Sequence, residues 1–404
     1  MKVLYLATRL PAPPWRGDQL RAFHHLRLLA PRHDVTCCAL VLRPPSADAV
    51  ATVAGLGVRV QVVPLGVAGA LPQLARGLLG DRRPFQLLLY RRRTARAAVD
   101  ALLVRERFDV VHAQLVRTAA YLPAADGPPL VLDLVDALSA NLRRRAARDH
   151  TPIGWVAAWE AGRVARAERA LITRASETLV VAEAERAALG GGRIRVVPNG
   201  VDLERFRFRA ARCTGARLLF AGNLGYFPNV DAARWLATDV FPRVRTAMPA
   251  AELRLAGARP TRTVARLARR AGVTLAADVP DMAAELAAAS VAVIPMRAGS
   301  GLQNKVLEAM AVGTPVVATP RAVAALDVER GRHLLVAETA DEIAGACVAL
   351  LRDPARGAAL ADAARTLVEA RYGWEASAAG VAASWEAARR TAATGPTRWP
   401  VAGE

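Results

Sequence analysis

The chain has 404 residues, which is too long for one hydrophobic core and predicts two or three domains. Its hydrophobic content of 53% is that of a folded protein, and no apolar run reaches the ~18 residues of a membrane span. The net charge of +19 leaves three explanations: an arginine-biased composition without consequence, an anionic membrane surface, or nucleic acid. Nucleic acid is the least favoured, because the aromatic residues are too scattered to form a base-stacking platform.

The cysteines and the N-terminal residues indicate the cellular compartment in which the protein is expected. Cys37, Cys38, Cys213 and Cys347 lack metal-ligand spacing and are expected to be reduced thiols, with the adjacent pair buried in a strand. Residues 1–14 alternate like a strand and lack the pattern of a signal peptide. We expect a cytoplasmic protein without a metal site, and peripheral contact with the inner membrane face stays open.

The first half of the chain alternates predicted strands and helices. Strands are expected at residues 1–8, 35–42 and 58–65, and a helix at 19–29 with Asp18 as its N-cap. Gly17 would let a ligand approach the start of that helix closely. Strand–helix–strand alternation is typical of a parallel α/β sheet.

Residues 69–109 form a basic stretch with a helical pattern, in which leucines alternate with arginines. Such a stretch can lie on anionic lipid. The simpler alternative is a solvated helix face beside a stripe of core residues.

Polar residues lie near the ends of two further predicted strands, at 110–114 and 130–139. These residues are His112, Gln114, Asp133, Asp136 and Ser139. Ligands bind at the carboxyl ends of parallel strands, so these side chains are candidate ligand contacts. A core role for His112, and helix capping by Asp136 and Ser139, are the alternatives.

The second half repeats the α/β pattern after a glycine hinge at 190–192. A helix at 153–175, with Trp155 and Trp159 on its apolar face, precedes the hinge. Beyond it, 193–206 is expected to open the new pattern, with strands at 217–224, 251–257, 273–279, 291–296, 315–319 and 333–338, and helices near 341–352 and 354–371. Two α/β halves on a short hinge predict a cleft between them.

The stretch 297–318 predicts an anion site. A buried strand is followed by a glycine turn and by a helix that Gly313 ends, and the free amides of a helix N-terminus attract negative charge. Lys305 and Glu308 lie just inside this helix. Only Lys2 and Lys305 are lysines among 55 basic residues, and a compact ammonium suits a phosphate. A solvated Lys–Glu pair is the alternative.

Asparagines gather in the second half. Asn199, Asn223, Asn229 and Asn304, four of the five in the chain, each follow a predicted strand or start a helix. Each one alone is explained as a turn former. Together they predict amide groups that line a polar ligand.

At this point the chain resembles the retaining GT-B glycosyltransferases of family 4, whose fold is two Rossmann-like parallel-sheet domains facing a central cleft. The resemblance rests on VVPNGVD (196–202), LLFAGNLGYFPNVDA (218–232), AGARP (256–260), DVPD (278–281), GSGLQNKVLEAMAVGTPVVAT (299–319) and RYGWE (371–375). Residues 9–30 and 131–139 are similar to bacterial sugar transferases associated with exopolysaccharide and protein-sorting loci. The domains implied are 1–190 on the acceptor side and 193–371 on the donor side, with helix 374–392 packing back on the first.

The resemblance implies a role for each matching residue. Glu308 matches the second glutamate of a Glu-x7-Glu element, which binds the donor ribose, while the first glutamate falls on Ser300. Donor contacts are expected from Gly17, Asn199, Gly222, Asn223, Asn229, Arg259, Val279, Ser300, Gly301, Leu302, Gln303, Lys305 and Glu308. Acceptor-side residues are Asp18, His112, Asp133, Asp136 and Ser139, and the catalytic candidates are Asp136, Lys305 and Glu308.

This chain departs from the family pattern in three places. Ser300 replaces a glutamate, the usual Arg and Lys pair after the first strand of the second domain is missing, and Val135 and Asp136 stand where many relatives have a histidine. Lys305 and Arg259 are then the candidate cations for the diphosphate, and Asp136 is the nearest polar substitute for the histidine.

The implied reaction is transfer of a sugar from a nucleotide-diphosphate sugar to a hydroxyl acceptor, with retention and without a metal or other cofactor. The acceptor is a sugar, a lipid-linked group or a small molecule, in polysaccharide, glycolipid or glycoconjugate biosynthesis. A nucleotide-sugar epimerase and a non-catalytic nucleotide-sugar-binding protein are the alternatives, and no nucleic-acid partner is expected.

Overall fold

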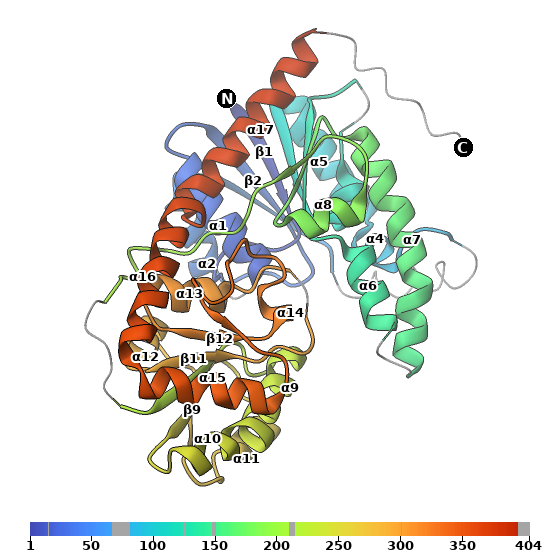
Figure 1. Cartoon of the computed structure of the whole chain (residues 1–404). Coiled ribbons are helices and arrows are strands. Elements are labelled where there is room, and N and C mark those ends of the chain that lie inside the picture. The colour runs from blue at the N-terminus through green and yellow to red at the C-terminus, as the bar shows by residue number, and fades with distance from the viewer. Residues whose placement is uncertain are drawn as a thin grey trace. The chain divides into compact units, whose positions relative to one another are not determined.

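A computed structural model of the protein describes residues 1–14, 16–66, 81–123, 126–147, 151–209, 215–299 and 301–394. The chain forms two compact units, Met1–Pro198 with Ser377–Glu404, and Asn199–Ala376. Figure 1 shows the course of the chain. Each unit is a parallel sheet covered by helices.

The first unit contains a seven-stranded sheet in the order β3-β2-β1-β4-β5-β6-β7, and every pair is parallel. Its strands are β1 (Lys2–Ala7), β2 (Asp34–Val41), β3 (Arg59–Pro64), β4 (Val110–Gln114), β5 (Leu130–Val135), β6 (Glu177–Val180) and β7 (Ile194–Val196). The central strands are nearly continuous apolar runs, because both faces of a parallel sheet are buried. In β1, Val3 and Tyr5 belong to one hydrophobic cluster and Leu4 and Leu6 to another.

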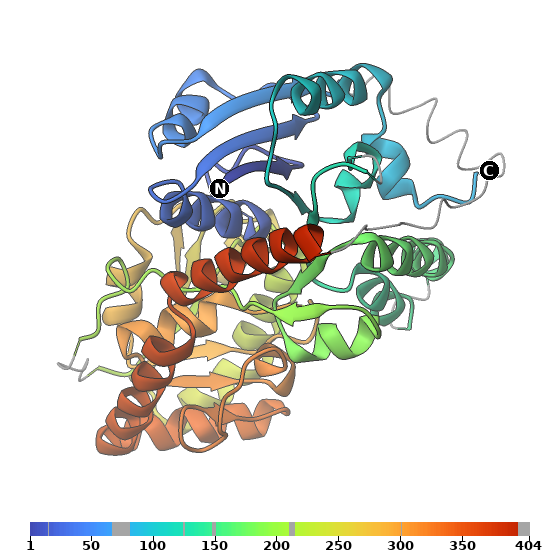
Figure 2. The same cartoon turned by 90° about the horizontal axis from the view of Figure 1, so that it is seen from above.

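Helices cover both faces of this sheet (Figure 2). They are α1 (Gly17–Leu29), α2 (Ala47–Ala54), α4 (Phe85–Tyr90), α5 (Arg93–Arg105), the 3-10 helix η1 (Val116–Tyr121), α6 (Leu138–Ala146), α7 (Pro152–Arg174) and α8 (Glu183–Leu189). The last helix, α17 (Trp374–Thr394), contributes Val381 and Trp385 to the cluster that contains β1 and α1. The end of the chain therefore completes the core of its first unit.

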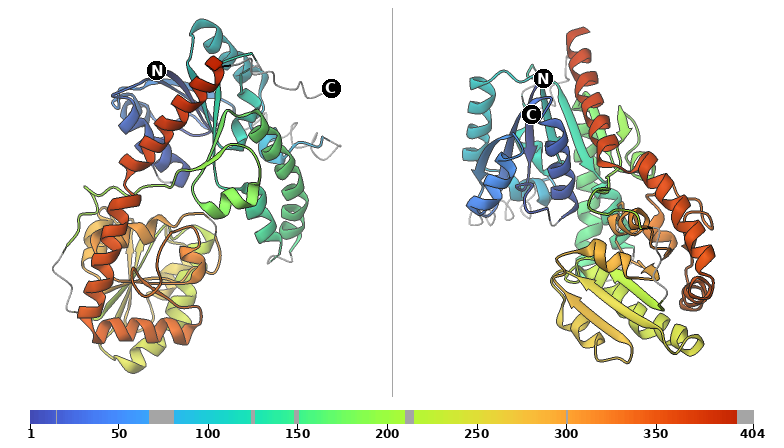
Figure 3. Two further views of the ribbon diagram at one scale, coloured as in Figure 1. Left: turned by 45° about the horizontal axis from the view of Figure 1, so that its top comes forward. Right: turned by 90° about the vertical axis from the view of Figure 1, so that its left-hand side faces the viewer.

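The second unit contains a six-stranded parallel sheet in the order β10-β9-β8-β11-β12-β13 (Figure 3). Its strands are β8 (Arg217–Ala221), β9 (Glu252–Gly257), β10 (Val273–Ala277), β11 (Val291–Ile294), β12 (Val316–Ala318) and β13 (Leu335–Val336). Its helices are α9 (Phe227–Trp235), the π-helix η2 (Leu236–Val240), α10 (Phe241–Ala247), α11 (Arg262–Leu267), α12 (Met282–Ala287), α13 (Asn304–Val312), α14 (Pro320–Val323), α15 (Ala340–Arg352) and α16 (Pro354–Arg371). One hydrophobic cluster holds these elements together.

Several predicted boundaries need correction. The strand expected at 130–139 ends at Val135, and α6 begins at Leu138, because Val135 has a left-handed φ of 67° that ends the extended backbone. Residues 194–196, expected to open the second pattern, pair with β6 in the first sheet instead. Three consecutive left-handed glycines, 190–192, precede them, so this run is a turn inside the first unit.

The basic stretch 69–109 lies partly outside the described residues, and its described part supports the simpler alternative. Val99 and Leu102 of α5 and Leu88 of α4 belong to the hydrophobic cluster under the sheet. The apolar face of these two helices is thus used inside the fold. Cys37, Cys38 and Cys347 are buried free thiols, as expected, whereas Cys213 lies outside the described part.

Candidate functional site

Helix α13 and the carboxyl end of β11 form the centre of the predicted anion site. β11 is buried along its whole length, and the chain turns after Met296 before α13 begins at Asn304. Gln303 stands at the N-cap without a side-chain capping bond, and Gly313 ends the helix with a left-handed φ of 89°. The first amides of α13 therefore lack a capping side chain, as an anion-binding helix terminus requires.

Lys305 is half-buried in the first turn of α13, and its ammonium group contacts three other elements. The Nζ atom donates to Asn229 Oδ1, lies 3.7 Å from Met296 Sδ and lies 5.1 Å from the centroid of the Phe220 ring. Burial lowers the pKa of Lys305 to about 8, although nearby Glu308 acts in the opposite direction. A cation held in partly apolar surroundings gains most from an anionic ligand.

Glu308 lies one turn further along α13 and is also half-buried. Burial raises the pKa of this carboxyl, and the charges of Lys305 and Arg205 act to lower it. Among the described residues, no side chain donates a hydrogen bond to the Glu308 carboxylate. Its two oxygens are thus available to accept hydroxyl hydrogen bonds.

The loop after β8 approaches the Lys305 side chain. Gly222 has a φ of 154°, and a Cβ atom on it would lie 3.2 Å from Lys305 Nζ. Asn229 is buried, and its amide donates to the main-chain oxygen of Asn223 at 2.9 Å. The Asn223 side chain accepts from the amide of Gly225 at 3.0 Å, which is the turn-forming role that was the alternative for each asparagine. Asn229, in the first turn of α9, therefore contacts Lys305 directly, whereas Asn223 holds the loop before it.

The other predicted donor-binding residues lie on several separate segments of the second unit. The loop after β9 joins the β8 loop through the Leu224 amide, which donates to Ala258 at 2.8 Å, and it carries exposed Arg259, whose φ is 54°. Gln303 donates to the Gly301 main-chain oxygen at 3.4 Å, and Leu302 packs against the core. Val279 is partly buried after β10, Asn199 is buried at the start of the second unit, and Ser300 lies outside the described residues.

In the first unit, His112 and Asp133 belong to a buried network. Asp133 accepts from Arg21 Nε at 2.7 Å, and His112 Nε2 lies 3.7 Å from the same carboxylate. Trp385 Nε1 of α17 donates to His112 Nδ1 at 3.1 Å. Both side chains have no exposed surface, which corresponds to the core alternative stated for His112.

The charges in this network balance each other. Burial acts to raise the pKa of Asp133, but the Arg21 guanidinium and His112 outweigh it, so the pKa lies well below its usual range. Burial lowers the pKa of His112 although the nearby Asp133 carboxylate acts to raise it. The network therefore holds an ionised Asp133–Arg21 pair beside a neutral histidine, and it fastens α17 to the sheet.

Asp136 lies between β5 and α6, close to two other carboxylates. The first amides of α6 are bound by these groups: Glu185 accepts from Ala137 at 2.8 Å and Glu168 from Ser139 at 3.2 Å. Asp136 itself accepts from Asn141 Nδ2 at 2.6 Å. Burial, with the nearby Glu185, raises the pKa of Asp136 to about 7. The N-cap of α6 is Ala137, so neither Asp136 nor Ser139 caps this helix.

Asp136 lines a small pocket in the first unit. Its walls include Leu115, Arg117, Leu138 and Glu168. Leu115 and Val135, which follow β4 and end β5, both have left-handed φ values near 68° and 67°. Strained backbone at two adjacent strand ends is found where a binding site imposes it. Asp136 is thus the predicted acceptor-side residue that faces an open space.

Gly17 and Asp18 lie at the start of α1, which begins two residues earlier than expected. The N-cap is Arg16, so the prediction of Asp18 as N-cap is wrong. The Asp18 carboxylate pairs with Arg9, and its main-chain oxygen accepts from Gln114 Nε2 at 3.0 Å. No described atom lies within 4 Å of where a Cβ of Gly17 would be, which leaves room for a ligand there.

Four residues of these networks were not predicted from the sequence: Arg21, Glu168, Glu185 and Trp385. Arg21 is a charged residue buried on α1 between apolar neighbours, and Glu168 and Glu185 are single carboxylates on helices with a solvated pattern. Their partners are far away in the sequence. Only Trp385, a large apolar residue inside a helical pattern, offered a signal for burial.

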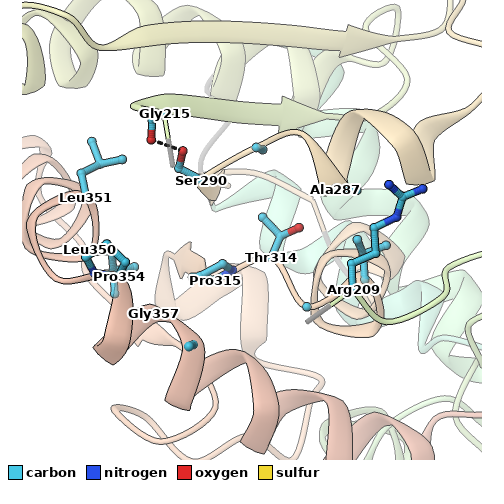
Figure 4. A pocket seen from close by; sticks show the side chains of 14 residues that line it. Arg209, Gly215, Ala287, Ser290, Thr314, Pro315, Leu350, Leu351, Pro354 and Gly357 are labelled. Atoms are coloured by element: carbon cyan, nitrogen blue, oxygen red, sulfur yellow. Dashed lines mark hydrogen bonds between the residues drawn. The ribbon is translucent and has the colours of Figure 1, made fainter. Parts of the chain in front are cut away.

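Another pocket lies at the opposite end of the second sheet. It lies where the chain enters β8, β11 and β12, with Gly215, Ser290, Thr314 and Pro315 in its wall (Figure 4). It is remote from the carboxyl ends of these strands. Among the described residues, no group of three or more His, Cys, Asp or Glu side chains could hold a metal ion, and no helix is long and apolar enough to cross a membrane.

Both halves of the chain match models of known protein families. Residues 21–205 match the family model described as Glycosyltransferase Family 4, and residues 215–353 match the one described as Glycosyl transferases group 1. A GDP-mannose-dependent monoacylated alpha-(1-6)-phosphatidylinositol monomannoside mannosyltransferase of Corynebacterium glutamicum is 30% identical over 199 residues. The match covers 44% of this chain and 52% of that relative, so the chain spans about half the length of this curated relative.

Solved structures resemble the whole chain. Sucrose-phosphate synthase of Thermosynechococcus elongatus has a TM-score of 0.71 at 18% identity and covers 98% of this chain and 100% of its own. Anabaena HepE, solved in complex with UDP, has a TM-score of 0.67 at 17% identity, over 96% of this chain and 100% of its own. The chain thus has the GT-B fold, and its two halves match, in this order, the models of a glycosyltransferase family 4 domain and of a glycosyl transferases group 1 domain.

Proposed function

We propose that this protein transfers a sugar from a nucleotide-diphosphate sugar to a hydroxyl acceptor, with retention of the anomeric configuration. The observation that carries the proposal is Lys305, a half-buried cation in the first turn of an uncapped helix, with the Glu308 carboxylate one turn further. A helix terminus with a cation and a carboxylate suits a ligand that joins phosphates to a hydroxylated ring. The two family matches support the same reading.

The diphosphate lies at the start of α13 in this proposal. The main-chain amides of Gly301, Leu302 and Gln303 donate to its oxygens, and the ammonium of Lys305 balances its charge, with Arg259 as a second cation. As the bond between the anomeric carbon and the phosphate oxygen breaks, negative charge grows on the leaving phosphate. Donors aimed at that oxygen each stabilise the transition state by about 2–4 kcal/mol.

Glu308 binds the nucleoside. Its two carboxylate oxygens accept hydrogen bonds from the two ribose hydroxyls, which fixes the nucleotide relative to Lys305. Asn229 and Gly222 keep the Lys305 ammonium in place, Asn229 by its hydrogen bond and Gly222 by leaving room. Val279 and Asn199 complete the donor contacts.

The first unit supplies the acceptor side. Asp136 at the pocket beside β5 orients the acceptor hydroxyl, with Ser139 and Asp18 near the same strand and helix ends. The buried Asp133 and His112 act indirectly, by holding α17 and α1 to the sheet. The acceptor oxygen forms the new bond to the anomeric carbon, and its proton passes to the leaving phosphate. No metal takes part in this scheme.

The relatives suggest which donors to test. HepE was solved with UDP, and the C. glutamicum relative uses GDP-mannose, so uridine and guanosine diphosphate sugars form the first panel. The acceptor belongs to polysaccharide, glycolipid or glycoconjugate synthesis in this proposal, as a sugar, a lipid-linked group or a small molecule. The C. glutamicum relative is named for a glycolipid acceptor.

A donor panel with product analysis tests the proposal. Thermal shift with UDP, GDP and their sugars should identify one base that raises the melting temperature, because a ligand that binds only the folded state stabilises it. With that donor, NMR of the product should show the donor's anomeric configuration, and chelation by EDTA should leave the rate unchanged. An epimerised donor without acceptor consumption, or binding without turnover over a broad acceptor panel, would instead favour the alternative functions.

A further inference from the structure

The start of α7 carries an exposed apolar cluster. Ile153, Trp155, Val156 and Trp159 lie in its first two turns and have exposed fractions of 59%, 70%, 55% and 47%. Large apolar side chains are usually exposed singly, and a group of them in one place marks an interaction surface. We call these four residues the α7 patch.

The fold of the first unit does not account for the α7 patch. A different face of α7 is already buried through Ala157, Ala161 and Val164, and α6 packs along the helix. Trp159 is partly held by the Phe85 ring, at a centroid distance of 5.2 Å, and by Arg163, whose guanidinium lies 3.6 Å from its centroid. Ile153, Trp155 and Val156 lie beyond these contacts. Helix α7 therefore has one apolar face in the core and a second apolar surface that is exposed.

The surroundings of the patch are positively charged. In the described residues of α6 and α7 the only carboxylates are Glu160 and Glu168, and both are buried. Arg143, Arg166 and Arg169 are exposed on the two helices, and Arg82 is exposed on the segment before α4, where Arg83 is paired with Asp81. Arg83 is joined to α7 directly, since its main-chain oxygen accepts from Arg163 at 3.2 Å. The exposed surface of α6 and α7 is thus apolar and cationic, and the described residues of these two helices expose no carboxylate.

We propose that the α7 patch docks on the surface of an anionic lipid bilayer. Tryptophan is favoured at the boundary between headgroups and acyl chains, where Ile153 and Val156 would enter beside Trp155. The surrounding arginines would pair with lipid phosphates, for which the guanidinium geometry is suited. From the sequence, the basic stretch 69–109 was one possible membrane surface, but the apolar face of its described helices is buried, and this leaves the α7 patch as the candidate contact.

Charge favours a bilayer over a second copy of the chain. A two-fold interface through the α7 patch would bring the same arginines of both copies together, with no exposed carboxylate on α6 or α7 to pair with them. Anionic lipid supplies the opposite charge. The aliphatic Ile153 and Val156 at the tip also fit acyl chains better than nucleic acid, which would offer phosphates alone.

Vesicle flotation tests the proposal without any sugar donor, so its outcome is independent of the proposed transferase activity. The full chain should float with phosphatidylcholine vesicles that contain roughly 30% phosphatidylglycerol at about 0.1 M NaCl, and much less with pure phosphatidylcholine. Raising the salt to about 0.5 M should weaken the electrostatic part of the binding. Equal flotation with neutral and anionic vesicles would overturn the role of the arginines.

Matched variants locate the contact. The double variant Ile153→Ser with Trp155→Ser should lower the partition coefficient at least about tenfold, from the apolar area withdrawn from the bilayer. Arg143→Gln should lower it about fivefold, as one cation near an anionic surface does. Val104→Ser is the control, because Val104 is 87% exposed on α5, outside the patch, and its replacement should change nothing. The melting temperature confirms that each variant is folded.

Two results would contradict the proposal. Unchanged flotation of the double variant would show that the α7 patch does not touch lipid. Light scattering that shows a dimer of the wild type and a monomer of the double variant, with no vesicle binding by either, would assign the patch to self-association. Quenching by brominated lipids gives a direct positive readout, which should diminish in Trp155→Phe while flotation is kept.

Discussion

The ammonium group of Lys305 donates a hydrogen bond to the side-chain oxygen of Asn229, and this bond joins α13 to the first turn of α9. The amide of Asn229 donates in turn to the Asn223 main-chain oxygen at 2.9 Å. Two residues that are 76 positions apart in sequence, one in the first turn of α9 and one in the first turn of α13, are thus joined at this cation. The donor-side proposals depend on this arrangement.

Replacing Glu308 tests the nucleoside contact. Glu308→Ala should weaken binding of the nucleoside diphosphate about tenfold or more, since hydrogen bonds to a charged group contribute about 1.5–3 kcal/mol each. The melting temperature without ligand should not fall, because burial already disfavours the ionised carboxylate. Titration calorimetry measures the affinity. Glu252→Gln, at the amino end of β9 in an exposed pair with Arg217, is the control. Unchanged affinity for Glu308→Ala would remove it from the site.

Asp136 should set a limb of the pH–rate profile. Its pKa is raised to about 7 by burial and by Glu185, so the ionised form that orients a hydroxyl builds up through this pH. The wild-type kcat/KM should rise across neutral pH, and Asp136→Asn should lose this limb and about 10²-fold in rate. Asp100→Asn, an exposed carboxylate on α5, should keep the wild-type profile. An unaltered profile for Asp136→Asn would contradict its role.

The same pKa shift has a consequence for stability. A native Asp136 holds its proton up to about pH 7, whereas an unfolded aspartate releases it near 3.8. Between these values the native state binds more protons, so this group lowers the free energy of unfolding as the pH rises. Asp136→Asn should remove that contribution.

The bond between Trp385 and His112 should stabilise the first unit. Trp385→Phe keeps most of the apolar volume but leaves His112 Nδ1 buried without its donor, which should cost about 1–3 kcal/mol of unfolding free energy. Trp155→Phe on the exposed start of α7 should cost less than about 0.5 kcal/mol. Chemical denaturation measures the unfolding free energy of both variants, which can be compared when their m-values agree. Equal stability of the two variants would show that the bond contributes nothing.

Acid should weaken the same network. Burial lowers the pKa of His112 and lowers that of His25 further, so both are neutral in the native state. Unfolded histidines take up protons as the pH falls below 6.5, which stabilises the unfolded chain and lowers the unfolding free energy. The pH dependence should diminish in Trp385→Phe, because nothing then competes with a proton for His112 Nδ1.

The strand, turn and helix around Lys305 were predictable from the sequence because each carries a local signal. The apolar run before Arg297 became β11, and Gly313 ends α13 as predicted. The environment of Lys305 was not predictable. Its contact with Asn229 depends on how the β8 loop folds over the helix, and a helical Lys–Glu pair looks the same in sequence when it is solvated.

The end of β5 shows why other predictions failed. Residues 130–139 have the apolar pattern of one strand, but Val135 adopts a left-handed φ and α6 starts at Leu138. The amides of Ala137 and Ser139 are bound by Glu185 and Glu168, which come from later helices. Likewise, α1 buries Arg21 because Asp133 and Val197 accept its hydrogen bonds. Local sequence patterns do not indicate which distant residues will become hydrogen-bond partners.

Calorimetric titration of the nucleoside diphosphate into wild type and Lys305→Met, at several pH values, tests the central claim most directly. At about pH 7 the variant should bind about 10- to 100-fold more weakly, by the loss of a charged hydrogen bond, with no loss of melting temperature. Wild-type affinity should fall as the pH rises past about 8, where Lys305 loses its proton, and the variant should not show this fall. Equal affinity of the two proteins at neutral pH, or the same pH dependence in both, would contradict the assignment of Lys305 to the diphosphate.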